Sequence, residues 1–154
     1  DLGTFDLYLE PGRYIVGDSA ILVVKVVDAD EKYVSELGVN AGFNVLDRPA
    51  RYKAYHEIVN VDKADAKPEK EYRVSGNLCE SGDVFTESKH HLRKLPATEE
   101  GDLLAILNAG AYGSTMSSNY NLRPRARVIM IDNGITKIIR ERDEFEDMVR
   151  RQYF

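Results

Sequence analysis

Hydrophobic and polar residues alternate in short stretches along most of the chain, and helical spacing is rare. Alternation over four to eight residues, or a short run of β-branched residues, is typical of a β-strand. This pattern predicts strands at residues 5–9, 23–28, 39–45, 56–61, 72–75 and 102–107. Residues 92–96 are predicted to be a connector between elements. The chain is therefore predicted to be mainly β.

The strongest local signal lies near the C-terminus. Residues 127–132 and 135–140 are both rich in Ile and Val, and Asn133-Gly134 separates them. Asn-Gly between two apolar runs is a strong short-range signal for a two-residue hairpin turn. These two segments are therefore predicted to form a hairpin.

Helical patterns occur only near the two ends. Residues 14–24 are compatible with a helix capped by Asp18 or Ser19, although the β-branched run that begins at Val23 leaves its end open. In residues 143–153, three apolar side chains fall on one face, and Asp143 is a candidate N-cap. The predicted architecture is an antiparallel β-barrel or sandwich with one helix near each end.

Composition narrows the functional classes. A chain of 154 residues can build one sizeable core, and its net charge of −5 disfavours non-specific binding to nucleic acid. One cysteine cannot form an internal disulfide, and no apolar run reaches the length of a membrane span. We therefore expect a cytoplasmic domain with no membrane or nucleic-acid partner. His90-His91 has no accompanying ligand cluster, so no metal site is predicted.

The one cysteine is the first candidate for chemistry. Cys79 is followed directly by Glu80 and stands between Gly76 and Gly82. A thiol beside a carboxylate can deliver a proton, although a lone cysteine is more often a small apolar core residue. A second candidate is the turn Glu10-Pro11-Gly12-Arg13, whose backbone N–H groups and arginine are suited to a phosphate, although for Pro-Gly alone an ordinary turn with a solvated arginine is the better explanation.

Four short segments, taken together and in this order, resemble one family. They are Glu10-Pro11-Gly12-Arg13, Arg48-Pro49-Ala50-Arg51-Tyr52, Cys79-Glu80-Ser81-Gly82-Asp83 and Ala109-Gly110-Ala111-Tyr112. The sequence resembles the C-terminal region of the diaminopimelate decarboxylase family from about Tyr8 onward. These are fold-type III enzymes dependent on pyridoxal 5′-phosphate (PLP), related to ornithine and arginine decarboxylases and to alanine racemase. The resemblance implies production of L-lysine and CO2 from meso-2,6-diaminopimelate.

The resemblance also implies roles for individual residues. It makes Cys79 the proton donor. Cofactor contacts are implied for Glu10, Gly12, Arg13 and Tyr112, with Glu10 beside the pyridine nitrogen and Gly12 and Arg13 at the phosphate. Substrate contacts are implied for Arg13, Arg48, Tyr52, Glu80 and Tyr112.

The family implies a domain boundary near the start of the chain. Residues 1–24 are expected to be the last strand and helix of a preceding α/β barrel, and residues 25–154 the C-terminal β domain. The lysine that binds PLP covalently belongs to the barrel in this family, and no lysine here has a matching context. We therefore expect the isolated chain, which lacks an initiator methionine, to be inactive. The family also implies a homodimer, with Cys79 and Glu80 of one subunit in the partner's active site.

Two alternatives stay open. A related decarboxylase acting on ornithine or arginine would share most of these segments, although Arg48 to Tyr52 and Glu80 favour diaminopimelate. The other alternative is a free-standing β domain that serves only in dimerisation.

Overall fold

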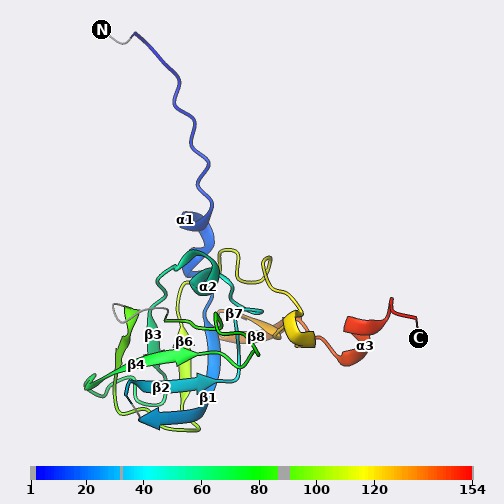
Figure 1. Cartoon of the computed structure of the whole chain (residues 1–154). Coiled ribbons are helices and arrows are strands. Elements are labelled where there is room, and N and C mark those ends of the chain that lie inside the picture. Colours follow the sequence, from blue (N-terminus) through cyan, green and yellow to red (C-terminus); the bar gives the residue numbers. More distant parts are fainter. Residues whose placement is uncertain (1–2, 32, 87–90, 154) are drawn as a thin grey trace.

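Six strands form one strongly curved sheet in the computed structural model, which describes residues 3–31, 33–86 and 91–153 (Figure 1). The spatial order of the strands is β3-β6-β1-β2-β4-β5. Their bounds are β1 Leu22–Glu31, β2 Ser35–Val39, β3 Ile58–Asn60, β4 Lys70–Ser75, β5 Arg93–Leu95 and β6 Leu103–Ile106. Neighbouring strands are antiparallel except for the β2–β4 pair, which is parallel.

The sheet is almost closed into a barrel. Arg93, at the start of β5, donates hydrogen bonds from Nε and Nη2 to the carbonyl oxygen of His56, at 2.9 and 2.7 Å. Since His56 lies just before β3, these bonds join the two edge strands of the sheet. The predicted barrel class is confirmed, with one parallel pair in place of a wholly antiparallel order.

Alternate side chains of the strands fill the barrel. Val24 and Val26 of β1 point inward and are almost completely buried, while Lys25 between them faces solvent. Leu37, Val74 and Leu104 come from three other strands and are fully buried in the same core. Burying an aliphatic side chain of this size stabilises a fold by about 1.5–3 kcal/mol. The alternation of apolar and polar residues in the sequence therefore identifies the side chains that point into the barrel.

Two predictions near the N-terminus differ from the structure. The predicted helix over 14–24 is reduced to α1, Arg13–Val16, and the 3-10 turn η1, Gly17–Ser19. The β-branched run joins β1, because it pairs with β6 on one side and β2 on the other. The predicted strand at 5–9 is exposed, irregular chain extending away from the barrel (Figure 1). A strand needs a neighbour to pair its backbone groups, and no described strand lies beside it.

Two further boundaries were wrong. The segment 39–45 is not a strand, because β2 ends at Val39 and the chain turns through Phe43–Val45 toward α2, Arg48–Tyr52. In contrast, the predicted connector at 92–96 contains β5. Three residues are too few to produce a clear alternation, so only pairing with β4 identifies this strand.

The C-terminal predictions hold in outline. The hairpin is confirmed as β7, Val128–Asp132, and β8, Ile135–Arg140, with positive φ at Asn133 and Gly134 as its turn requires. The last helix, α3, spans only Phe145–Val149, and its N-cap is Glu144, not Asp143. A short 3-10 turn, η3, occupies Tyr120–Leu122. Within the described ranges, no helix has the length and apolar character that crossing a bilayer requires.

Candidate functional site

The candidate site residues come from one end of the barrel. Strand pairing brings the starts of β1, β3 and β5 together with the ends of β2, β4 and β6. The segments attached at that end carry every predicted site residue: Glu10, Gly12, Arg13, Arg48, Tyr52, Cys79, Glu80 and Tyr112. Segments separated in the sequence are therefore gathered by topology alone.

Three arginines surround one histidine at this end, and we call Arg13, Arg48, Arg93 and His56 the arginine cluster. Arg48 begins α2, where Pro49 fixes the first turn and Lys53, at φ +55°, ends the helix. Its Nη1 lies 3.2 Å from Nε2 of His56. No described carboxylate forms an ion pair with any of the three arginines. The cluster is therefore a concentration of positive charge suited to an anionic ligand.

His56 is buried at the centre of this cluster. Its Nδ1 lies 2.7 Å from the carbonyl oxygen of Leu107, which follows β6. Burial lowers the pKa of His56, and the positive charges of Arg48, Arg93 and Arg13 lower it further. The hydrogen bond to Leu107 raises this pKa, but the net change is a decrease. The imidazole is therefore neutral near pH 7.

Tyr112 completes this side of the site. It lies in the loop after β6 with φ +66°, a conformation that non-glycine residues seldom adopt. The guanidinium carbon of Arg48 lies 6.0 Å from the centre of its ring. Its hydroxyl would be 2.6 Å from a Cβ placed on Gly12. Gly12 therefore leaves the space that allows α1 and Tyr112 to meet.

The second part of the site is the loop of residues 76–83, which we call the Cys79 loop. Asp83 is buried beneath it and accepts hydrogen bonds from the backbone N–H groups of Phe43 and Leu78, both at 2.7 Å. Gly76 and Gly42 pack against this carboxylate so closely that a Cβ on either would lie within 2.6 Å of one of its oxygens. Burial raises the pKa of Asp83, against these two backbone bonds. The loop is thus fastened to the turn that carries Phe43.

Glu80 is presented at the surface of this loop. Its carboxylate accepts hydrogen bonds from the backbone N–H of Gly82 at 3.1 Å and from the hydroxyl of Tyr120 at 3.3 Å. The Gly82 bond is the main cause that lowers the pKa of Glu80, and Tyr120 and Ser81 contribute. Glu80 is therefore ionised at neutral pH and suited to a cationic amino group. Cys79 beside it is exposed, and its backbone N–H donates to Oδ1 of Asn121 at 3.0 Å.

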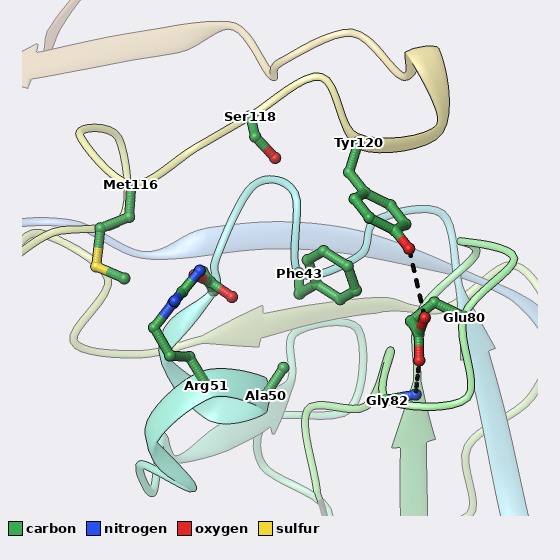
Figure 2. A pocket seen from close by; sticks show the side chains of 9 residues that line it. Phe43, Ala50, Arg51, Glu80, Gly82, Met116, Ser118 and Tyr120 are labelled. Carbon is green, nitrogen blue, oxygen red and sulfur yellow. Dashed lines mark hydrogen bonds and ion pairs between the residues drawn. The ribbon is translucent and has the colours of Figure 1, made fainter.

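Glu80 lines an open pocket of about 490 Å³, shown in Figure 2. Phe43 and Tyr120 pack against each other on one side of it, with ring centres 4.8 Å apart and the ring planes tilted by 59°. Arg51, on α2, faces the pocket and pairs with Asp47 at 2.5 Å. The pocket therefore combines a carboxylate with no described cationic partner, two aromatic rings, and an arginine whose charge is balanced by Asp47.

The structure brings some predicted residues together and leaves others apart. Arg48 contacts Tyr112, which meets Gly12, and the charge of Arg13 reaches His56 in the same cluster. Glu10 and Tyr52 are exposed, and no described contact links either to the cluster. Cys79 and Glu80 are side by side, and their described contacts are with Asn121, Tyr120 and residues of their own loop.

Sequence reasoning missed three residues of this site. His56 was assigned only to a strand, Asp83 only to a motif, and Phe43 only to a strand that does not form. The sequence signal that marks the surroundings of Asp83 is a pair of glycines, Gly42 and Gly76. Both positions exclude a side chain because the Asp83 carboxylate packs against their backbone. His90 lies outside the described residues. Among those described, no three His, Cys, Asp or Glu side chains gather as a metal ion would require.

Comparisons with known proteins converge on one group. A family model described as "Pyridoxal-dependent decarboxylase, C-terminal sheet domain" matches residues 13–110. The chain is 46% identical over 151 residues to a diaminopimelate decarboxylase of Methanothermobacter thermautotrophicus, covering 98% of this chain and 34% of that protein. It is 45% identical over 146 residues to the enzyme of the same name from Archaeoglobus fulgidus, covering 95% and 34%.

A solved structure gives the same result in three dimensions. The diaminopimelate decarboxylase of M. jannaschii in complex with L-lysine superimposes with a TM-score of 0.82 at 37% identity, covering 94% of this chain and 32% of that one. The chain thus spans about a third of the length of the relatives it matches.

Proposed function

Because the chain belongs to the family of C-terminal sheet domains of pyridoxal-dependent decarboxylases, we propose that it forms part of a diaminopimelate decarboxylase. The reaction is the release of CO2 from meso-2,6-diaminopimelate to give L-lysine. The observation that carries this proposal is that the sheet domain presents two kinds of group: an arginine cluster with no described carboxylate ion-pair partner, and an ionised Glu80. In a two-fold dimer, the arginine cluster of one subunit and Glu80 of the other would face one substrate. A substrate with carboxylate and ammonium groups at both ends needs both kinds of contact.

The residues present fit the phosphate of PLP. Gly12 leaves room for the Tyr112 hydroxyl at the start of α1, and Arg13 adds a positive charge. A phosphate needs several donors and positive charge, and Gly12, Arg13 and Tyr112 supply both. Glu10 precedes this turn and is assigned to the pyridine nitrogen. When bound, PLP supplies the electron sink for the electron pair left by departing CO2.

The remaining residues bind the substrate and hold a proton. Arg48 and Arg13 bind a carboxylate of the substrate, and Arg48 offers the planar fork suited to it. Tyr52 and Tyr112 line the same ligand, and Glu80 accepts from the distal ammonium group. Glu80 thereby favours substrates that carry a distal amino group over substrates that lack one. The Cys79 thiol holds the proton that replaces CO2 on the carbon.

The active enzyme in this proposal is a two-fold dimer that also contains the α/β barrel portion of the same protein. The residues before β1 end that barrel, and the sheet domain begins at Leu22, a little earlier than the sequence-based boundary at residue 25, because Leu22–Lys25 already pair with β6. Two features support composite sites at the dimer interface: Cys79 is exposed, and none of its described contacts involves the arginine cluster. Cys79 and Glu80 of one subunit enter the site of the other, which places the proton donor on a defined face of the substrate.

The test uses the full-length enzyme with PLP added. Replacing Cys79→Ala should lower lysine formation by about 10²–10⁴-fold while PLP absorbance is retained, because a positioned proton donor contributes about this much. Lys94→Ala, at an exposed position of β5, serves as the control and should retain activity. Preference for ornithine or arginine in a substrate panel would favour the related decarboxylases. Unchanged turnover of the Cys79→Ala enzyme would remove the cysteine from the mechanism.

A further inference from the structure

We propose that His56 is a positioning residue, a buried neutral imidazole that accepts a hydrogen bond from Arg48 and holds its guanidinium toward the substrate carboxylate. This rests on the proposed function, in which Arg48 binds a carboxylate. No segment of the family resemblance includes His56. Its role follows from contacts with three separate parts of the chain: α2, β5 and the segment after β6.

Geometry fixes the proton on this imidazole. The carbonyl oxygen of Leu107, 2.7 Å from Nδ1, can only accept, so Nδ1 carries the hydrogen. The guanidinium of Arg48, 3.2 Å from Nε2, can only donate, so Nε2 offers its lone pair. Both contacts are satisfied together only by the neutral Nδ1–H tautomer.

The surroundings of His56 maintain this state. The charged groups that act on it are Arg13 from α1, Arg48 from α2 and Arg93 from β5, all positive. Arg93 also binds the backbone carbonyl of His56 itself, so the residue is fixed through both main chain and side chain. Burial and three cations all oppose a second proton on the ring. The acceptor is therefore present throughout the neutral pH range.

The consequence for Arg48 is orientation. A flexible arginine loses rotamer freedom when it binds a ligand, and one held in place beforehand loses less. The bond to His56 uses one terminal nitrogen, and the Tyr112 ring lies 6.0 Å from the guanidinium carbon. An anionic partner for Arg48 would have tied it down as well, but it would also have cancelled the charge the carboxylate needs. A neutral acceptor orients the arginine and leaves its charge available.

The experiment measures binding of L-lysine, the product, to the full-length PLP-loaded enzyme by calorimetry. His56→Gln keeps an amide oxygen that can accept from Arg48, whereas His56→Met has similar length and no comparable acceptor. A hydrogen bond to a charged group corresponds to about 10- to 100-fold in affinity. We therefore expect the Met variant to bind lysine about 10- to 100-fold more weakly than the wild-type enzyme. The Gln variant should have an affinity close to that of the wild type.

Specificity for the carboxylate is tested with L-lysinamide, which retains both amino groups and carries no carboxylate. The Met and Gln variants should bind lysinamide equally, since Arg48 has no anion to hold there. Thermal unfolding of both variants identifies any loss of fold. The lysine affinities of the Gln and Met variants are compared at a temperature at which both are folded to the same extent. Equal lysine affinity for the two variants would overturn the role of His56.

Arg48→Met separates this inference from the proposed function. If Arg48→Met leaves lysine binding unchanged, Arg48 is not a carboxylate ligand and the substrate assignment itself fails. If Arg48→Met weakens lysine binding while the His56 variants do not differ, only the positioning role of His56 fails.

Discussion

Removing the Asp83 side chain should destabilise the chain and release the Cys79 loop. Asp83→Ala deletes the acceptor of two buried backbone N–H groups, those of Phe43 and Leu78, each 2.7 Å from a carboxylate oxygen. An unsatisfied buried donor costs about 1–3 kcal/mol. The two together therefore give roughly 2–6 kcal/mol by the same principle.

Part of this loss is offset. Burial raises the pKa of Asp83, which shows that the ionised carboxylate itself is disfavoured where it lies, and the alanine variant no longer has this cost. We therefore expect a net loss of about 2–4 kcal/mol for Asp83→Ala. Asp83→Asn retains one acceptor and should lose about half as much, since one of the two N–H groups then faces an amide donor.

The assays are urea denaturation and NMR titration of the Glu80 carboxyl group. The Glu80 pKa is low mainly because of the Gly82 N–H in the same loop, so loosening the loop should move it up toward the usual value. Asp102→Ala is the matched control. Asp102 is also buried and accepts from Asn60, Lys63 and Glu99, but it lies at the opposite end of β6.

The control variant should be destabilised, and its Glu80 pKa should stay where it is in the wild type. Asp83→Ala with wild-type stability, or with an unchanged Glu80 pKa, would refute the view that this carboxylate fastens the loop.

Two further predictions concern PLP and acid. In the full-length enzyme, Gly12→Ala would place a Cβ 2.6 Å from the Tyr112 hydroxyl and should weaken PLP binding in a fluorescence titration. Gly82→Ala is the control, because a Cβ there would meet only a carboxylate oxygen of Glu80, at an ordinary 3.5 Å. Equal PLP affinities of the two variants would contradict the role given to Gly12. Arg125 holds the pKa of Asp143 well below the unfolded value of 3.8, so Asp143 contributes stability above that value and loses it as the pH falls further. Urea midpoints between pH 5 and 2 should therefore fall less steeply for Asp143→Asn, and parallel curves would argue against this pair.

Local signals explain which parts of the fold could be predicted. The hairpin was correct because Asn133-Gly134 carries its own turn chemistry and needs no distant partner. Residues 14–24 suited both helix and strand, and the choice was made by pairing of β1 with β2 and β6, which no local window contains. The same holds for β5, whose three residues are recognisable only against β4.

The candidate site divides in the same way. Short segments such as the Cys79 loop contain the thiol, carboxylate and arginine side chains on which the predicted chemistry depends, so these candidates could be identified from the sequence. What joins them is long-range: His56 meets Leu107 across 51 positions, and Asp83 meets Phe43 across 40. The positive φ of Tyr112 belongs to the same class, because it is imposed by a loop and not by the residue type. Sequence reasoning therefore indicated candidate reactive groups, whose roles stay predictions, and missed the residues that hold them.

The position of these holding residues explains why a β-barrel suits the task. His56 and Arg93 lie at strand ends, and Asp83 lies in the loop that follows β4. Each of the three is fixed by hydrogen bonds to backbone groups of neighbouring segments. A movement of any of them would have to break bonds to neighbouring segments whose core side chains are fully buried. The exposed groups assigned to chemistry, Cys79 and Glu80, therefore sit on a short loop above a rigid base. Binding geometry has to be held to a fraction of an ångström, and an almost closed sheet with the candidate site residues at one end is suited to that precision.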